Sequence, residues 1–187
     1  MTYVHVTWLA AALRSEGCTV VEQAGWKTRG RPTSTGQFNP RAVLLHHTAS
    51  GINSSSSNPH PALNTVINGR SDLPGPLCHI LIDWRGWCYT IAAGRANHAG
   101  TARASGPMPA GDGNALYVGI EIDYNAPHQG HSTAQFSAVL TATTAILRHF
   151  GKNESYVRAH RETSTTGKID PSGIDMANFR ALVGIQL

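Results

Sequence analysis

Two consecutive segments decide the fold, LYVGIEIDY at residues 116–124 and STAQFSAVLTATTAILRHF at residues 132–150. Apolar and other side chains alternate in the first segment, and this pattern is typical of a strand with one face in the core. The apolar face carries Val118, Ile120 and Ile122. The opposite face carries Gly119, Glu121 and Asp123, so that a carboxylate is directed away from the core.

The second segment predicts a helix. Ser132 and Gln135 have the spacing of a capping box, and apolar residues keep helical spacing until Gly151. Further strands are expected at 18–21, 43–48, 79–83, 87–91 and 157–159, and further helices at 7–17, at 62–67 and after the capping residue Asp175. Because strands alternate with helices, we predict an α/β fold, a single domain with a mixed central β-sheet flanked by helices.

Length and charge narrow the classes of function. The 187 residues suit one domain, and residues 1–40 are expected to form an N-terminal helix–strand extension and loop within it. The formal net charge of +4 favours anionic partners, but no run of clustered Lys and Arg suggests a nucleic-acid site. No stretch approaches the roughly 18 apolar residues of a membrane span. The first residues lack the features of a signal peptide.

The three cysteines are expected to be free thiols. They are odd in number and form no CxxC pair. A hairpin turn at residues 84–86 would place Cys88 opposite Ile82 or Asp83, and Cys78 on the order of 15 Å further along the strand. That separation exceeds the roughly 7 Å between Cα atoms that a disulfide tolerates.

Histidines and one acidic loop point to metal chemistry. The predicted strand at 43–48 ends in His46 and His47, and His160 lies ten residues before Asp170. Two histidines and a carboxylate from separate segments are what an open, three-ligand zinc site requires. Neighbours on a strand face opposite ways, so only one of His46 and His47 can enter such a site. Lys168 precedes Asp170 by two residues, so an extended loop would direct both side chains the same way.

Five ordered motifs resemble those of a known family. They are VLLHHTA at 43–49, CHILIDWRG at 78–86, NHAG at 97–100, VGIEI at 118–122, and RAHRE at 158–162 with KIDP at 168–171. Together these motifs resemble the zinc-dependent N-acetylmuramoyl-L-alanine amidases of the type 2 class, whose fold is shared by peptidoglycan recognition proteins and small phage lysins. The similarity spans roughly residues 41–183, and residues 41–187 are taken as the catalytic domain.

The resemblance implies a role for each matching residue. His46, His160 and Asp170 would hold Zn²⁺, which selects His46 over His47. Glu121 would be the general base, and Lys168 would stabilise charge beside the metal.

Three further residues are candidates for substrate contact. His98 would line the substrate groove, and Trp84 at the hairpin tip could stack on a saccharide, although tryptophans are more often core or rim residues. His79 is also a candidate, with a structural role near the site as the alternative.

One position departs from the family pattern. Several relatives have Tyr where Cys78 stands, and we expect Glu121 to cover that loss. Cys78 could instead be an extra ligand, but strand parity groups it with Ile80 and Ile82 on the apolar face.

The implied activity is hydrolysis of the amide between N-acetylmuramic acid and L-alanine in peptidoglycan. We expect a monomeric phage endolysin, made in the host cytoplasm and released to the cell wall through a phage holin. The alternatives are a bacterial wall-recycling amidase and a non-catalytic peptidoglycan-binding protein. Binding-only relatives usually lose a zinc ligand, whereas this chain keeps the whole set.

Overall fold

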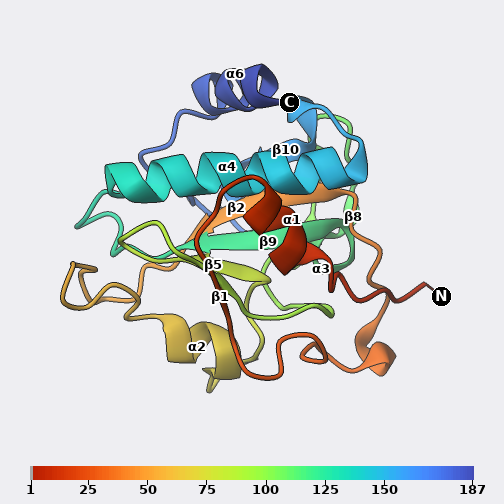
Figure 1. Cartoon of the computed structure of the whole chain (residues 1–187). Coiled ribbons are helices and arrows are strands. Elements are labelled where there is room, and N and C mark those ends of the chain that lie inside the picture. Colours follow the sequence, from red (N-terminus) through yellow and green to blue (C-terminus); the bar gives the residue numbers. More distant parts are fainter. Residues whose placement is uncertain (1) are drawn as a thin grey trace.

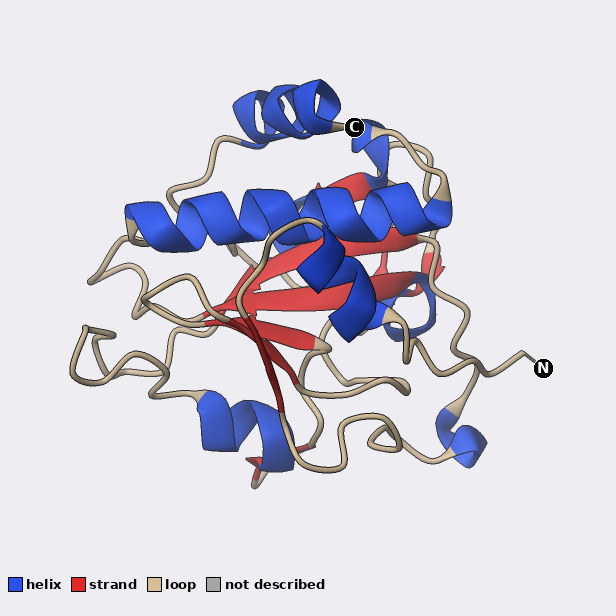
Figure 2. Ribbon diagram, in the orientation of Figure 1, coloured by secondary structure: helices blue, strands red, loops and turns tan. Residues whose placement is uncertain are grey.

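The computed structural model describes residues 2–187 and is built around one six-stranded sheet (Figures 1 and 2). The strands, in spatial order, are β1 (Val20–Glu22), β6 (Cys88–Thr90), β5 (Ile80–Ile82), β9 (Tyr117–Ile122), β2 (Ala42–His47) and β10 (Val157–Ala159). Only the β5–β6 pair is antiparallel, and the other four pairs are parallel. The sheet is therefore mixed, and the predicted fold class is confirmed.

Helices cover both faces of the sheet (Figure 1). They are α1 (Leu9–Ser15), α2 (Leu63–Asn68), α3 (Gly113–Leu116), α4 (Thr133–Phe150), α5 (His160–Thr163) and α6 (Met176–Gln186), with 3₁₀ turns at Thr33–Thr35 and Glu154–Tyr156. The long helix α4 crosses β2, β5 and β9, and α1 and α6 pack against it. The short helix α2 lies on the other side of the sheet, where Val66 packs with Leu81 and Tyr89.

The helix predicted at 132–150 is confirmed, and its caps explain its ends. The Ser132 hydroxyl accepts a hydrogen bond from the Gln135 backbone N–H at 3.0 Å, and the Ser132 N–H donates to the Gln135 side chain at 2.9 Å. Gly151 ends the helix with a left-handed φ of 61°, a conformation that favours glycine. The helix therefore begins and ends where local chemistry satisfies its free backbone groups.

The face assignment of β9 is also confirmed. Val118, Ile120 and Ile122 are fully buried in the main hydrophobic core beneath α4. Glu121 lies on the opposite face and is the register partner of His46 on β2. Because partners on adjacent parallel strands share a face, these two polar side chains meet on one side of the sheet.

Two small sheets were not predicted from the sequence. One joins β3 (Gly69–Arg70) to β4 (Leu73–Pro74), and the other joins β7 (Thr101–Ala102) to β8 (Gly111–Asp112). The second lies within the long segment that connects β6 to β9. With two residues per strand, neither sheet is long enough to give a readable alternation.

The cysteines are free, as predicted, and Cys88 lies opposite Ile82. The parity argument for Cys78 is wrong, because its side chain packs with Leu81 and Ile91 instead of with Ile80. Strand β5 begins only at Ile80, so alternation does not extend back to Cys78. Burial raises the pKa of the Cys78 thiol well above its ordinary value, and the nearby Glu121 carboxylate adds to the effect.

The N-terminal segment contributes to the same core. Leu9 and Leu13 of α1 are fully buried, and β1 forms an edge of the central sheet beside β6. The boundary placed at residue 40 stays a prediction. Among the helices within residues 2–187, we find none that combines the length and the apolar character needed to cross a bilayer.

Candidate metal centre

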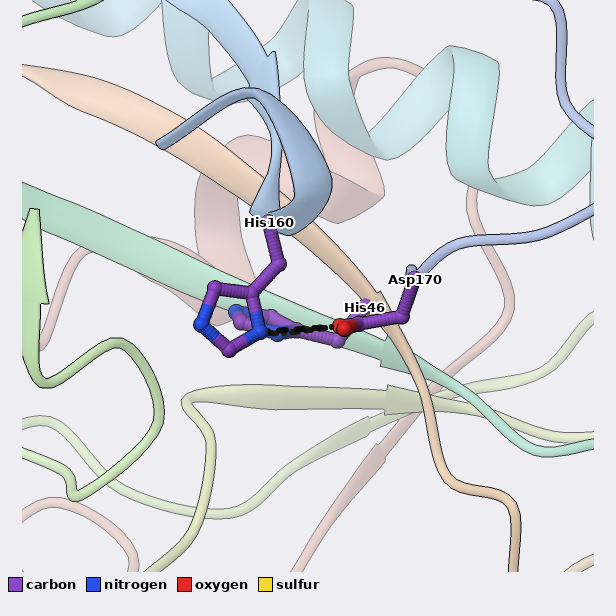
Figure 3. A group of neighbouring side chains, drawn as sticks. All are labelled: His46, His160 and Asp170. Carbon is purple, nitrogen blue, oxygen red and sulfur yellow. Dashed lines mark hydrogen bonds and ion pairs between the residues drawn. The ribbon is translucent and has the colours of Figure 1, made fainter. Parts of the chain in front are cut away.

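One side chain from β2 and two from the segment after β10 converge at the carboxyl ends of these strands (Figure 3). His46 is near the end of β2, His160 follows β10 as the first residue of α5, and Asp170 comes from the next loop. The two strands are parallel neighbours, so their carboxyl ends meet at one edge of the sheet. The three residues predicted as zinc ligands are thus brought together.

The ligand atoms form a nearly equilateral triangle. The distances are 3.1 Å from His46 Nδ1 to His160 Nδ1, 2.9 Å from His46 Nδ1 to Asp170 Oδ2, and 3.0 Å from His160 Nδ1 to Asp170 Oδ2. Ligand atoms around a tetrahedral zinc ion, at bond lengths of about 2.0–2.1 Å, lie about 3.3 Å apart. The observed triangle is close to that spacing, and its two nitrogens and one oxygen are donor atoms that zinc accepts.

The protonation states of His46 and Asp170 also favour the binding of a cation. Burial lowers the pKa of His46, which favours the neutral imidazole that a metal requires. Burial alone would raise the pKa of Asp170, but its contacts with His160 and His46 outweigh this and hold the pKa well below its usual range. A neutral imidazole and an ionised carboxylate therefore face one point.

The neighbouring His47 is excluded from the triangle. Its Nδ1 accepts a hydrogen bond from the Ser172 backbone N–H at 3.1 Å, and its ring meets Tyr124 edge-on. Tyr124 in turn donates its hydroxyl to the Ser172 carbonyl. His47 and Tyr124 therefore help to fix the loop that follows Asp170, and the choice of His46 agrees with the geometry.

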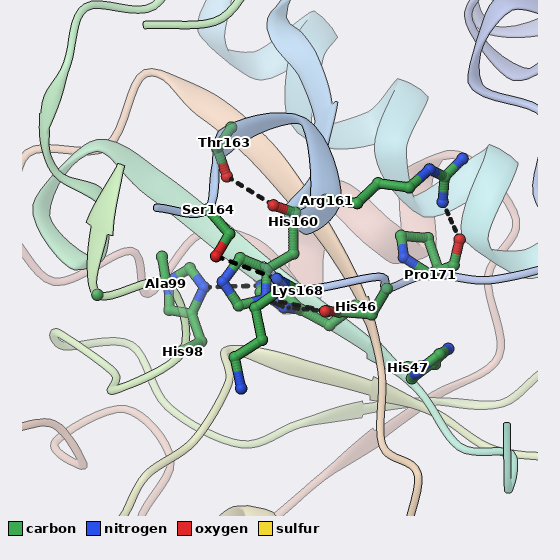
Figure 4. Close-up of polar contacts among 12 residues, drawn as sticks. His46, His47, His98, Ala99, His160, Arg161, Thr163, Ser164, Lys168 and Pro171 are labelled. Carbon is green, nitrogen blue, oxygen red and sulfur yellow. Dashed lines mark hydrogen bonds and ion pairs between the residues drawn. The ribbon is translucent and has the colours of Figure 1, made fainter. Parts of the chain in front are cut away.

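Arg161 anchors the same loop from the other side (Figure 4). Its backbone N–H donates to the Asp170 carbonyl at 2.9 Å, and its guanidinium donates to the carbonyls of Pro171 and Ile174. These bonds hold the backbone on both sides of the Asp170 carboxylate. Because the loop is already ordered, a metal that binds there causes a smaller loss of conformational entropy.

Glu121 lies beside the triangle. Its register partner is His46, and its Oε2 atom is buried without a hydrogen-bond partner among residues 2–187. Burial raises the pKa of Glu121 well above its ordinary value, the carboxylates of Asp170 and Asp123 raise it further, and Lys168 opposes them. A buried carboxyl group whose pKa is raised by its surroundings, and which faces a cavity, is a candidate for general acid–base chemistry.

The triangle opens onto a cavity of ≈ 680 Å³, which is in the usual range for a small-ligand site. Its lining includes Glu121, Lys168 and His98, three of the residues singled out in the sequence. Sequence reasoning missed Arg70 of β3, Leu73 of β4 and the exposed Ile169. Ile169 lies between two residues of the KIDP motif and could have been noticed, whereas no signal in the sequence pointed to the β3–β4 residues.

Two candidates for substrate contact do not line this cavity. His79 is fully buried, accepts a hydrogen bond from the Gly119 N–H at 2.9 Å and stacks on Phe38. The hairpin-tip residue Trp84 packs against the main core, and its carbonyl accepts from the Ser132 hydroxyl at the start of α4. The tip of the β5–β6 hairpin lies against α4, so Trp84 is away from the cavity, and His79 takes the structural position that was its alternative. Cys78 does not line the cavity either, which argues against a fourth ligand there.

Comparison with known proteins is consistent with this geometry. The family model described as N-acetylmuramoyl-L-alanine amidase matches residues 36–173, and no curated protein matches the sequence. Among solved structures, a selenomethionine derivative of AmpD has a TM-score of 0.62 at 20% identity, covering 88% of this chain and 93% of that chain.

Two further structural relatives are similar at the same level. The catalytic domain of XlyA has a TM-score of 0.61 at 19% identity and covers 89% of this chain and 99% of its own. The endolysin amidase LysCS from Clostridium intestinale has a TM-score of 0.60 at 17% identity, with 87% and 93% covered. At these identities the likeness establishes the shared fold.

Proposed function

The chain belongs to the N-acetylmuramoyl-L-alanine amidase family, and on that premise we propose that it cleaves peptidoglycan with a zinc ion held by His46, His160 and Asp170. It is thus an enzyme, a peptidoglycan amidase. The observation that carries the zinc assignment is the triangle of two nitrogens and one oxygen, spaced by 2.9–3.1 Å. The scissile bond would be the amide between the lactyl group of N-acetylmuramic acid and L-alanine.

Amide hydrolysis requires a nucleophile, a group that transfers a proton, and stabilisation of the oxyanion that forms. Zinc bound by two neutral imidazoles and a carboxylate would supply Lewis acidity, which lowers the pKa of water and polarises a carbonyl. Glu121 would take the proton from the attacking water and pass it to the departing L-alanine amine. Its Oε2 atom, which has no hydrogen-bond partner among residues 2–187, would accept that proton.

Lys168 would supply the oxyanion stabilisation. Its side chain extends from the loop before Asp170 into the cavity (Figure 4), and its charge opposes the rise in the pKa of Glu121. A fixed cation beside a developing oxyanion typically contributes a few kcal/mol to the transition state. Arg70, whose guanidinium pairs with Asp72, and Ile169 add a polar and an apolar surface on the cavity wall for the rest of the substrate.

The reaction product tests the proposed activity. Mass spectrometry of digested peptidoglycan is expected to show released stem peptides with a free L-alanine amine. EDTA should abolish their release, and zinc should restore it. Newly formed reducing sugars, or release that continues unchanged in EDTA, would contradict the assignment.

For the biological role we propose a phage endolysin that acts as a monomer on the host wall, made in the host cytoplasm and released through a phage holin. The formal charge of +4 supports action on an anionic wall polymer. A wall-recycling amidase is the alternative, and it would prefer soluble muropeptides. Turnover on intact sacculi that exceeds turnover on soluble fragments at equal bond concentration favours the endolysin, and the reverse order favours recycling.

A further inference from the structure

His46 has a second contact that the metal site alone does not explain. Its Nδ1 atom belongs to the triangle, and its Nε2 atom lies 3.0 Å from Nδ1 of His98. The two rings are perpendicular, with centroids 5.2 Å apart and an interplanar angle of 88° (Figure 4). An edge nitrogen of each imidazole thus faces the other at hydrogen-bond distance.

The direction of this hydrogen bond follows from the chemistry of imidazole. If His46 offers the Nδ1 lone pair to a cation, the ring proton must be on Nε2. That proton then points at Nδ1 of His98, which must be the acceptor. His98 therefore carries its own proton on Nε2, and the pair has one arrangement in which His46 can act as a ligand.

His98 has an anchored backbone and a ring that packs closely on β9, while its Nε2 atom has no hydrogen-bond partner among residues 2–187. Its backbone N–H and that of Ala99 each donate to the Asn114 side-chain oxygen at 2.8 Å. On its other side, the ring lies directly on Gly119 of β9, where an added Cβ would come within 2.6 Å of His98 Nδ1. The glycine in the VGIEI strand thus leaves space for the imidazole.

We propose that His98 is a positioning residue that holds His46 in the tautomer and orientation whose Nδ1 faces the metal. The inference rests on the proposed zinc function. Metal-ligating histidines usually donate their second N–H to a carboxylate, a carbonyl or water, and loss of that partner typically costs 10–100-fold in metal affinity or activity. Here a neutral imidazole takes the place of that partner, so its role differs from contact with substrate alone.

A pair of variants tests the hydrogen bond. His98→Phe keeps a ring but removes the acceptor, and zinc affinity, measured by competition with a chromogenic chelator, is expected to fall about 10–100-fold. In His98→Asn the side-chain oxygen can occupy the position of Nδ1, so most of the affinity should return. Gly119→Ala, which keeps all of the histidines, should weaken zinc binding by displacing the His98 ring. Thermal unfolding of the metal-free variants reports whether each one is folded.

The outcomes separate this inference from the proposed function. Unchanged zinc affinity in folded His98→Phe would overturn it, and so would equal losses in His98→Phe and His98→Asn. A raised KM with unchanged zinc affinity would assign His98 to substrate contact only. If the unmodified protein bound no zinc, both the proposed cofactor and this inference would be wrong. The other results would overturn the inference alone.

Discussion

Glu121→Gln is expected to retain one zinc ion per chain and to lose about 10²–10⁴-fold in amidase turnover. The substitution keeps the size of the side chain, but an amide cannot accept the proton of the attacking water. Glu121 is the register partner of His46 and lines the cavity, so its carboxylate is next to the proposed metal without belonging to the ligand triangle. Turnover on a soluble muropeptide and metal content by mass spectrometry measure the two effects separately.

A matched control is available on the edge strand. Glu22 is exposed, pairs with Arg14 and does not line the cavity, so Glu22→Gln should leave turnover unchanged. Full wall-lytic activity in Glu121→Gln would remove this residue from the mechanism. Loss of zinc together with turnover would instead give Glu121 a role in metal binding.

Asp170→Ala is expected to lose bound zinc and, with it, measurable amidase activity. The substitution removes the only carboxylate of the triangle and leaves two neutral imidazoles, which cannot complete a three-ligand site. Zinc should raise the unfolding temperature of the unmodified protein, because a ligand that binds only the folded state stabilises it. The same zinc concentration should not raise that of the variant.

Asp175→Asn provides the control for Asp170→Ala. Asp175 caps α6 through the N–H groups of Ala177 and Asn178, and asparagine caps helices about as well as aspartate. Its zinc content and activity should match those of the unmodified protein. Equal zinc content in Asp170→Ala and Asp175→Asn would refute the ligand assignment.

The parts of the fold that the sequence predicted well are those set by local chemistry. The capping box of Ser132 and Gln135 and the alternation through Ile120 and Glu121 depend on residues a few positions apart. The histidines of the site were also identifiable, because family motifs mark them and parallel strands bring their ends together. Their exact contacts, such as the one between His46 on β2 and His98 in a loop, were not, since these join segments that are distant in the sequence.

The sequence-based errors concern residues whose positions depend on tertiary packing and not on local chemistry. Trp84 was a candidate for stacking on a saccharide as a residue of the hairpin tip, although core and rim placements are commoner for tryptophan. In the structure that tip meets the start of α4, where an added Cβ on Gly86 would come within 2.6 Å of the Ala134 carbonyl. Cys78 was misplaced because the pleat was extended beyond the first residue of β5. The positions of Trp84 and Cys78 both depend on tertiary packing, which a local sequence pattern does not report.

Anomalous diffraction at the zinc absorption edge, from crystals of the zinc-loaded protein, tests the metal centre most directly. We predict one strong peak, about 2.0–2.2 Å from each of His46 Nδ1, His160 Nδ1 and an Asp170 carboxylate oxygen. A peak elsewhere in the molecule, or no peak at these three side chains under saturating zinc, would contradict the assignment.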